Sequence, residues 1–471
     1  MKRLAGMAAP ALVLLLWTGL HARPAAGQTV DKIDSGLRGR IDATIAKMLH
    51  ESGVPSASVA VVQHHQLVYT HAYGLARVDP QVPATTEMRY AIGSISKQFT
   101  AAAILMLVQQ GKLSLDDPVD KYIPGLTRGD EVTIRELLSH TSGYRDYWPE
   151  DYVMRPMLRP EAPLQILDTW AKQPLDFVPG TKWQYSNTNY VIAGQIVEKM
   201  TGEPLVQFLA ERIFRPLKMN SVRNFDQNGL GAGDPTGYFR HALGPLRPVP
   251  KEGRGWMSAA GELAMTAHDL ALWDVSLMNQ TVLSSESYRQ MFTEVKLKDG
   301  VGTNYGLGVQ VLERGGHRVI EHSGEVAGFV SDNEVLIDNG DAVAVLTNQI
   351  AASAASSIAH AVAPMLIGGQ LSLSPEEQKA YEIYRGLQEG KLDRKLLSPN
   401  LNAYFSAEAI ADFKNSLEPL GEPTAFKLMR SEERGGMTFR IFTVTYPDRR
   451  LELTTYTYPN GMLEQYLVAP E

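Results

Sequence analysis

The segment Gly93-Ser-Ile-Ser-Lys97 places two residue types used in nucleophilic catalysis three positions apart. Apolar residues predict a buried helix over 95–110, so Ser94 lies at a helix start, where backbone N–H groups favour negative charge. Lys97 follows one helical turn later on the same face. Because burial lowers a lysine pKa, Lys97 could take a proton from Ser94. The pattern is short, and a capping serine with an exposed lysine would produce it by chance.

Tyr185-Ser-Asn187 forms a second group of reactive and polar side chains. A tyrosine is a weak base unless a cation stabilises its phenolate, and Lys97 could be that cation. The amide of Asn187 offers a donor and an acceptor to a substrate. The pattern also occurs as Tyr458-Pro-Asn460, among predicted strands, so it does not define a site by itself.

His322-Ser-Gly324 forms a third group, at the end of one predicted strand and just before another. A histidine can carry a positive charge there, and a glycine lets a substrate backbone approach closely. A surface histidine before a turn is the alternative. His140, in Leu137-Leu-Ser-His-Thr-Ser-Gly143, has hydroxyl and glycine neighbours, which favour a structural role at a helix end.

The elements around these groups predict an α+β fold, with one antiparallel sheet completed by both ends of a domain. A helix is expected near residues 37–49, ending at Gly53, and the middle, about 145–300, is rich in helices and loops. The expected strands are 57–63, 67–74, 307–312, 318–322, 329–337 and 342–346, followed by a helix over 351–366.

A second, smaller α+β domain is expected after residue 374. Ser374-Pro-Glu-Glu377 has the N-cap, N1 and N3 residues of a helix start. Two helices and then strands near 426–431, 438–446, 450–458 and 462–468 are predicted. The expected domain limits are 28–368, a linker at 369–374, and 375–471.

Composition excludes several classes of function. Acidic residues outnumber basic ones, 52 to 45, for a formal net charge of −7, which disfavours nucleic-acid binding. There is no cysteine, and hence no thiol nucleophile, disulfide or cysteine-bound metal. No HExxH, P-loop or dinucleotide-binding pattern occurs. We expect no metal ion and no organic cofactor.

Residues 1–27 have the features of a cleavable signal peptide. Lys2 and Arg3 precede the apolar run Ala11–Trp17, and Ala25-Ala-Gly27 ends the segment. The run is short for a membrane span, so an uncleaved anchor is the less favoured alternative. We expect a periplasmic or secreted protein with no membrane span after cleavage.

The order of the motifs resembles that of the serine β-lactamase and penicillin-binding-protein-like superfamily. The nearest resemblance is to the branch with class C β-lactamases, D-aminopeptidases and carboxylesterases. It covers about residues 35–366. The motifs that carry it are Ser94-x-x-Lys97, Leu137–Gly143, Tyr185-Ser-Asn187, Ser258-Ala-Ala-Gly261 with Thr266–Leu270, Tyr305-Gly-Leu-Gly308 and His322-Ser-Gly324.

The resemblance implies a β-lactamase/transpeptidase-like sheet flanked by helices, with a helical subdomain. It implies that Ser94 is acylated, that Lys97 and Tyr185 share acid–base work, and that Asn187 holds the substrate amide. His322 stands where many members have the lysine of Lys-Thr-Gly. The backbone N–H groups of Ser94 and Glu325 would form the oxyanion hole.

Two departures from the family pattern bear on the substrate. His322 is only partly charged near neutral pH, which would weaken binding of a substrate carboxylate. Glu325 would repel carboxylates if it faced the cleft. Both favour a small-molecule or peptide substrate of a peptidase (D-amino-acid or peptidoglycan type) or an esterase over one of a β-lactamase or penicillin-binding carboxypeptidase.

A non-catalytic protein that binds cell-wall fragments is the alternative of a different class. The resemblance does not include the C-terminal domain, for which active-site cover, dimerisation and cell-wall binding stay open. The oligomeric state is open too.

Overall fold

The computed structural model describes residues 29–150, 152–367, 373–423, 425–446 and 449–470. The predicted signal peptide and residues 369–372 of the predicted linker lie outside this part of the chain. Two hydrophobic cores lie within residues 37–366 and a third within 380–466, and no residue is shared between them.

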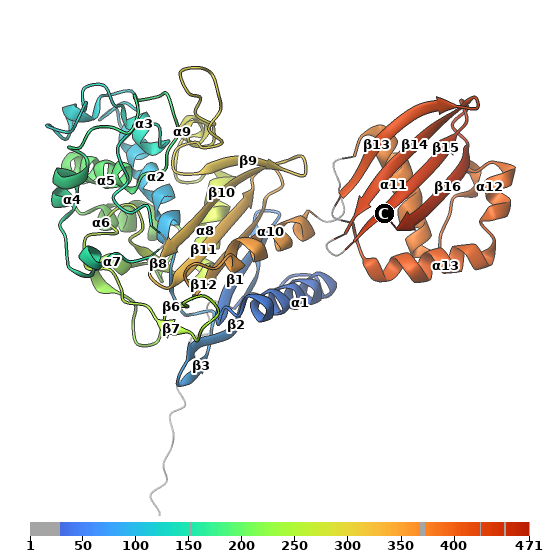
Figure 1. Cartoon of the computed structure of the whole chain (residues 1–471), viewed down its shortest axis with the longest axis horizontal. Coiled ribbons are helices and arrows are strands. Elements are labelled where there is room, and N and C mark those ends of the chain that lie inside the picture. Colours follow the sequence, from blue (N-terminus) through green and yellow to red (C-terminus); the bar gives the residue numbers. More distant parts are fainter. Residues whose placement is uncertain (1–28, 151, 368–372, 424, 447–448, 471) are drawn as a thin grey trace, which may run out of the picture.

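An antiparallel sheet is the centre of the N-terminal region (Figure 1). Its strands, in spatial order, are β3 (Gln81–Pro83), β2 (Gln66–Val78), β1 (Ser56–Gln63), β12 (Asp341–Thr347), β11 (Phe329–Leu336), β10 (His317–Val326) and β9 (Gln310–Arg314). β1 pairs with β12 from Ala57↔Thr347 to Val62↔Ala342, so segments far apart in sequence complete one sheet. This confirms the predicted antiparallel α+β fold.

Helices cover both faces of this sheet. α1 (Ser35–Ser52) and α10 (Ala354–Leu366) pack on one face, where Ile41, Ile45 and Ile358 are buried. α8 (Ala267–Asn279) packs on the other face, against β1, β2, β11 and β12. Successive side chains along β10 and β11 therefore point alternately toward the face covered by α10 and the face covered by α8.

A helical part lies beside the sheet, on the left of Figure 1. Its helices are α2 (Ser96–Gln109), α3 (Ile134–Leu138), α4 (Pro163–Trp170), α5 (Asn187–Thr201), α6 (Leu205–Leu209), α7 (Phe225–Asn228) and α9 (Ser285–Met291). A small sheet of β4 (Tyr90–Ala91), β8 (Leu263–Met265) and β5 (Arg223–Asn224) and a hairpin of β6 (Tyr238–Phe239) and β7 (Arg247–Pro248) complete it. α2 packs against α5 and α6, which fixes the helix that starts just after Ser94.

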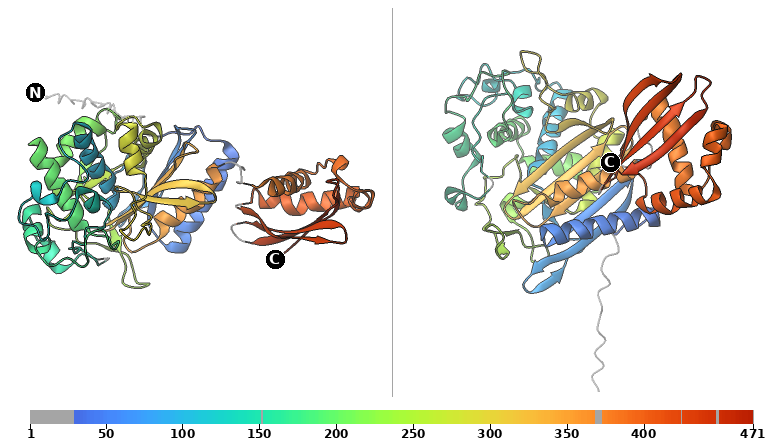
Figure 2. Two further views of the ribbon diagram at one scale, coloured as in Figure 1. Left: turned by 90° about the horizontal axis from the view of Figure 1, so that it is seen from above. Right: turned by 45° about the vertical axis from the view of Figure 1, so that its right-hand side comes forward.

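The C-terminal region is a four-stranded antiparallel sheet with helices on one face (Figure 2, left). Its elements are α11 (Pro375–Glu389), α12 (Pro399–Tyr404), α13 (Ala407–Leu417), β13 (Ala425–Arg434), β14 (Met437–Thr445), β15 (Arg450–Thr457) and β16 (Leu463–Pro470). The capping box predicted at Ser374 and Glu377 is present. Short α12 brings the helices to three where two were predicted.

Local backbone geometry corrects two other predictions. The strand predicted to begin at 307 begins at Gln310, because Gly308 has φ +77° and residues 307–309 form a bend. The helix predicted from 351 begins at Ala354, because Ala351 has φ +54°. Among the described residues, no helix is both long and apolar enough to cross a lipid bilayer.

Candidate active site

Ser94 lies in a single 3₁₀ turn, Gly93–Ile95, between β4 and the first residue of α2. Gly93 has φ +50°, and a Cβ atom there would lie 2.7 Å from the backbone nitrogen of Glu325 on β10. Only glycine tolerates both conditions. The turn is thus held against the end of β10, with the Ser94 side chain partly exposed.

Lys97 is fully buried, and its ammonium donates to the Ser94 hydroxyl. The Nζ–Oγ distance is 2.9 Å, and Nζ also donates to Asn187 Oδ1 at 2.8 Å and to the Ala260 carbonyl at 2.8 Å. Burial lowers the pKa of Lys97 to about 7, although the nearby carboxylate of Asp146 acts in the opposite direction. Near neutral pH, Lys97 can therefore both release and accept a proton.

Tyr185 lies just before α5, and the Ser94 hydroxyl is close enough to lower the pKa of its phenol, against the larger effect of burial. The Lys97 ammonium is 4.9 Å from the centre of its ring. Burial raises the pKa of Tyr185 well above its usual value, so the side chain is a neutral phenol in this arrangement. It is placed to pass on a proton rather than to start as a phenolate.

Asn187, the first residue of α5, is held at both ends of its amide. Its Oδ1 accepts from Lys97, and its Nδ2 donates to the carboxylate of Asp146, with N–O distances of 3.2 and 3.3 Å. Because Oδ1 accepts from Lys97 and Nδ2 donates to Asp146, the predicted contact with a substrate amide would use the second hydrogen of Nδ2. The structure thus gives Asn187 a second task, which is to anchor Lys97.

His322 lies on β10 and is held as a neutral ring. Its Nδ1 is 2.5 Å from the carbonyl of Ser323, which can only accept, so Nδ1 carries the proton. Nε2 then accepts from the hydroxyl of Tyr305 at 2.8 Å. Burial, together with the charge of Lys97, lowers the pKa of His322 to about 4. His322 therefore brings no positive charge to the site at neutral pH.

Gly324 makes a close contact within the chain itself. A Cβ atom at this position would lie 1.9 Å from the carbonyl oxygen of Ile92. The glycine therefore makes room for the chain's own backbone next to Ser94, and the approach of a substrate backbone at this position stays a prediction. It also fixes the end of β10, which brings the Glu325 nitrogen next to Gly93.

The Glu325 side chain points away from the cleft. Residues 322 and 325 differ by an odd number along β10, so their side chains lie on opposite faces of the sheet. Glu325 Oε1 accepts from the backbone N–H of Ala351, just before α10, at 3.1 Å. Repulsion of a substrate carboxylate by Glu325 therefore has no support in the structure.

His140 is buried, has φ +60°, and accepts a hydrogen bond from the backbone N–H of Ser186 through Nδ1 at 3.2 Å. Its ring lies 4.2 Å from that of Tyr185, centre to centre. Burial and the charge of Lys97 keep its pKa well below 6.5. These contacts agree with the structural role expected of His140, which is to hold the segment that carries Tyr185.

Three groups that contact the site residues were not predicted from the sequence. Asp146 and Tyr305 hold Asn187 and His322, and the carbonyl of Ala260 accepts from Lys97. Tyr305 and Ala260 belong to motifs used for the family resemblance, but only as markers. No spacing in the sequence ties Asp146 to Lys97.

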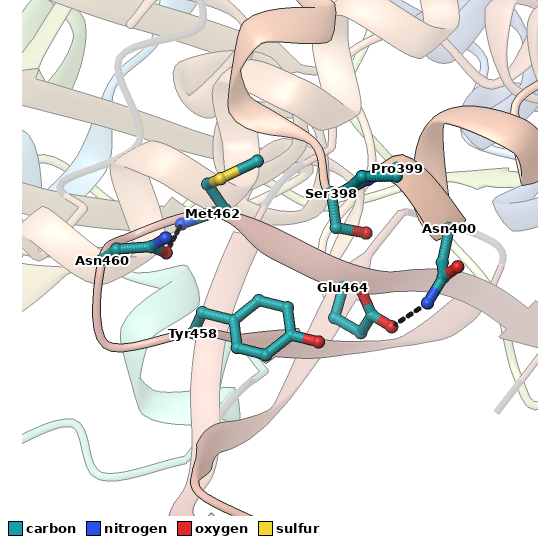
Figure 3. A pocket seen from close by; sticks show the side chains of 7 residues that line it. All are labelled: Ser398, Pro399, Asn400, Tyr458, Asn460, Met462 and Glu464. Atoms are coloured by element: carbon teal, nitrogen blue, oxygen red, sulfur yellow. Dashed lines mark hydrogen bonds between the residues drawn. The ribbon is translucent and has the colours of Figure 1, made fainter.

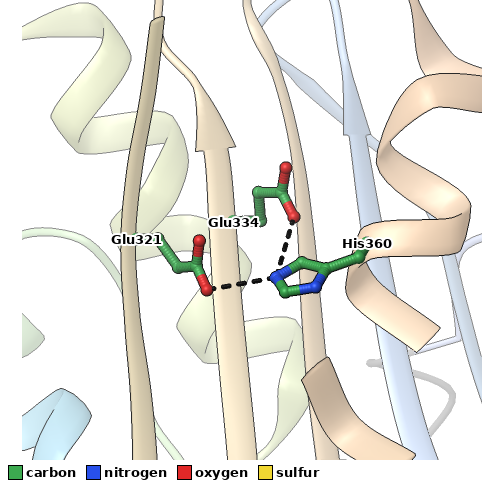
Figure 4. Close-up of side chains that lie close together, drawn as sticks. All are labelled: Glu321, Glu334 and His360. Carbon is green, nitrogen blue, oxygen red and sulfur yellow. Dashed lines mark hydrogen bonds and ion pairs between the residues drawn. The ribbon is translucent and has the colours of Figure 1, made fainter. Parts of the chain in front are cut away.

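A cluster on the opposite face of the sheet has the residue types of a metal site (Figure 4). His360 Nε2 on α10 lies 3.2 Å from Glu321 Oε1 and 3.8 Å from Glu334 Oε2. The guanidinium of Arg314 lies 2.5 and 2.7 Å from oxygens of the same two carboxylates. Because both carboxylates already have a cationic partner, the cluster is an ion-pair network that joins α10 to the sheet.

A separate pocket of about 300 Å³ lies in the C-terminal region (Figure 3). Its polar groups bond one another: Asn400 Nδ2 donates to Glu464 at 2.7 Å, and the Met462 N–H donates to Asn460 at 3.0 Å. Tyr458 lines the same pocket. The second Tyr-x-Asn pattern of the chain therefore lies outside the Ser94 site.

Comparison with known proteins identifies the family of the chain. The family model described as Beta-lactamase matches residues 41–362, more than half of the chain. The chain belongs to the Beta-lactamase family. This confirms the resemblance inferred from the order of the motifs, and the chain is similar in sequence to D-aminopeptidases and to a penicillin-binding protein. Its likeness to a D-amino-acid amidase, at 23% identity, concerns the fold alone.

Three similar proteins illustrate the relationship. A D-aminopeptidase of Brucella anthropi is 32% identical over 284 residues, covering 58% of this chain and 52% of that protein. The chain thus spans about half the length of this curated relative. A D-stereospecific amidohydrolase from Streptomyces sp. is 28% identical with a TM-score of 0.59, covering 68% of this chain and 98% of that one.

The third is an octameric penicillin-binding protein homologue from Pyrococcus abyssi. It is 23% identical with a TM-score of 0.63 and covers 92% of this chain and 99% of that one. At this identity the likeness concerns the fold alone. Because the coverage exceeds the family match, the shared fold extends into the C-terminal region.

Proposed function

We propose that this family member is an exported serine hydrolase that cleaves amide bonds of D-amino-acid or peptidoglycan-type substrates through an acyl-enzyme on Ser94. The observation that carries the proposal is the 2.9 Å hydrogen bond from the buried Lys97 to Ser94, with the ring of Tyr185 beside the same ammonium. Export rests on residues 1–27, which lie outside the described part of the chain.

The proposed reaction consists of acylation and deacylation of Ser94, and each step transfers one proton. Neutral Lys97 takes the proton of Ser94 as its oxygen attacks the substrate carbonyl. The N–H groups of Ser94 and Glu325 stabilise the resulting oxyanion, at roughly 3–4 kcal/mol per donor. The proton passes through Tyr185 to the leaving amine, the carbon–nitrogen bond breaks, and water then hydrolyses the ester on Ser94 with the same groups as base and acid.

The electrostatics around His322 support a substrate without a carboxylate beside the scissile bond. Both ring nitrogens of His322 are engaged, by Ser323 and Tyr305, and the ring is neutral at pH 7. The position therefore lacks the cation that grips carboxylates in relatives with Lys-Thr-Gly. The names of the relatives, D-aminopeptidase and D-stereospecific amidohydrolase, support an amino-acid amide of the D series.

The proposal is tested with D- and L-alanine and phenylalanine p-nitroanilides and with benzylpenicillin. We expect Ser94-dependent release of p-nitroaniline from the D compounds in preference to the L compounds. We expect no penicillin adduct by intact mass and no opening of the drug. A stable Ser94-dependent penicillin adduct would favour a penicillin-binding carboxypeptidase, and rapid opening a β-lactamase.

Two further results would redirect the assignment. Turnover of short p-nitrophenyl esters without any turnover of the anilides would favour an esterase. Binding of a muropeptide with no Ser94-dependent turnover of any of these compounds would favour a non-catalytic wall-fragment binder.

The pH dependence of kcat/KM is a separate prediction. Lys97 must be neutral to accept the proton of Ser94, and its pKa is about 7. We therefore expect kcat/KM to rise with pH through about 7, as the protonated form is titrated away. His322→Gln should leave this limb in place, because the pKa of His322 lies at about 4. A pH profile that is flat between pH 5.5 and 8.5 would contradict the assignment of Lys97 as the base.

A further inference from the structure

Asp146 is a nearly buried carboxylate beside the proposed catalytic groups. It is 8% exposed and lies in the loop that follows α3. Its Oδ1 accepts from the backbone N–H of Asn187 at 2.9 Å and of Trp148 at 3.2 Å. Both of its oxygens also face Asn187 Nδ2. Asp146 therefore holds the start of α5 through main-chain and side-chain contacts.

These contacts decide how the amide of Asn187 is oriented. A carboxylate can only accept hydrogen bonds, and an ammonium can only donate. With Nδ2 toward Asp146 and Oδ1 toward Lys97, both contacts are favourable. A flipped amide would place oxygen against the carboxylate and NH₂ against the ammonium. Asp146 thereby selects the one orientation in which Asn187 accepts from Lys97.

We propose that Asp146 is a positioning residue that acts on Ser94 through Asn187 and Lys97, by orienting the Asn187 amide and by placing a negative charge near the Lys97 ammonium. The inference rests on the proposed function of Ser94 and Lys97. Asp146 touches neither of the reacting groups, since its contacts are with Asn187 and Trp148.

The charged and titratable groups around Lys97 determine in which direction the pKa of Lys97 should change when Asp146 loses its charge. They are Asp146, Tyr185 and Tyr190, and the rings of His140 and His322. Burial keeps both tyrosines as phenols and both histidines neutral. Asp146 is the carboxylate of this set. Burial raises its own pKa, and in its ionised form it favours the protonated form of Lys97. Removing its charge should therefore lower the pKa of Lys97 further.

The test is the rate at which a fluorophosphonate labels Ser94 between pH 5 and 9, which needs no knowledge of the substrate. For Asp146→Asn we expect the acid limb of this rate to move to lower pH by about 1 unit. We expect the plateau to fall about 10- to 100-fold, because two amides facing each other no longer select one orientation of Asn187. Asp146→Glu keeps the charge, so its limb should stay in place while its plateau falls.

Asp176→Asn is the matched control. Asp176 pairs with Arg145, the neighbour of Asp146, at 2.8 Å and has no contact with Lys97 among the described residues. For this variant, the acid limb and the plateau of the labelling rate should match those of the wild type. A fallen plateau with an unmoved limb in Asp146→Asn would reduce Asp146 to a structural residue and overturn the inference. If that variant does not fold, an Asp146→Glu variant with a wild-type plateau overturns it.

Failure of the proposed function would look different. Wild-type protein that is not labelled, or equal labelling of wild type and Ser94→Ala, would overturn the role of Ser94. Labelling that depends on Ser94, together with wild-type behaviour of Asp146→Asn, would overturn only the role of Asp146.

Discussion

Ser94→Ala lowers kcat for the substrates of this protein by about 1,000-fold or more while leaving the fold intact, if Ser94 is the acylated nucleophile. The effect is large because no other hydroxyl can replace the bond that Ser94 forms with the substrate. The side chain is partly exposed in the middle of a 3₁₀ turn, so its loss creates no cavity in the core. Steady-state rates and urea unfolding of both proteins give the comparison.

Ser96→Ala is the matched control, because it changes the same residue type two positions away. Ser96 is 2% exposed, and its hydroxyl accepts from the backbone N–H of Leu263 at 3.2 Å. Its removal leaves a buried N–H without that partner, which costs about 1 kcal/mol of stability. Ser96→Ala should therefore lose stability and keep activity, the reverse of Ser94→Ala. Ser94→Ala with near wild-type turnover would disprove the acyl-enzyme.

The parts of the site that could be predicted depend on local geometry. Ser94 and Lys97 lie one helical turn apart, so their contact follows from the helix predicted over 95–110. The sheet could be predicted as antiparallel from the order of elements, and β1 does pair with β12. The strands predicted at 57–63 and 67–74 are present as β1 and β2, and they pair as a hairpin in which His64 and His65 adopt positive φ without the usual Asn-Gly turn residues.

The parts that could not be predicted depend on packing between distant segments. Asp146 reaches Asn187 only because the loop after α3 packs against the start of α5. Gly324 makes space for the carbonyl of Ile92, more than 200 residues earlier, a contact that no motif encodes. The neutral state of His322 depends on Tyr305 and on burial, and residue type alone suggested partial charge.

The face on which Glu325 lies could not be predicted, because the predicted strand ended at residue 322. β10 continues to Val326, and strand alternation along it places residue 325 on the opposite face from residue 322. The pairing of β10 with β11 and the contact of Glu325 with Ala351 show that alternation does hold to the end of this strand.

Lys97→Met is expected to abolish activity and to change how stability depends on pH. Methionine has a similar volume, but it can neither take a proton from Ser94 nor donate to Asn187 and Ala260. We expect kcat to fall by about 1,000-fold or more, as for the nucleophile, because the two residues act as a unit. The pH dependence of stability is the more specific of the two results, because it reports directly on the free-energy cost of burying the Lys97 ammonium.

Folding lowers the pKa of Lys97 from 10.5 to about 7. The unfolded chain therefore binds more protons than the folded protein between these values, and the stability of the wild type should rise with pH across this window. Lys97→Met lacks this contribution, so the wild type should gain on the variant by up to about 1.4 kcal/mol per pH unit between pH 7 and 9.5. Below pH 7 the penalty of burying the ammonium is complete, and the difference between the two proteins should stop changing on account of Lys97.

Urea unfolding at several pH values measures this difference, and Lys112→Met is the control. Lys112 is an exposed lysine just after α2, so its variant should follow the wild type in parallel. Parallel curves for Lys97→Met and the wild type from pH 7 to 9.5 would mean that folding does not shift the pKa of Lys97. Lys97 would then be protonated near neutral pH, and Ser94 would need another base. A difference in stability from the wild type that changes with pH for Lys97→Met and not for Lys112→Met would instead tie the free-energy cost of burying Lys97 to its capacity to activate Ser94, since the same burial produces both.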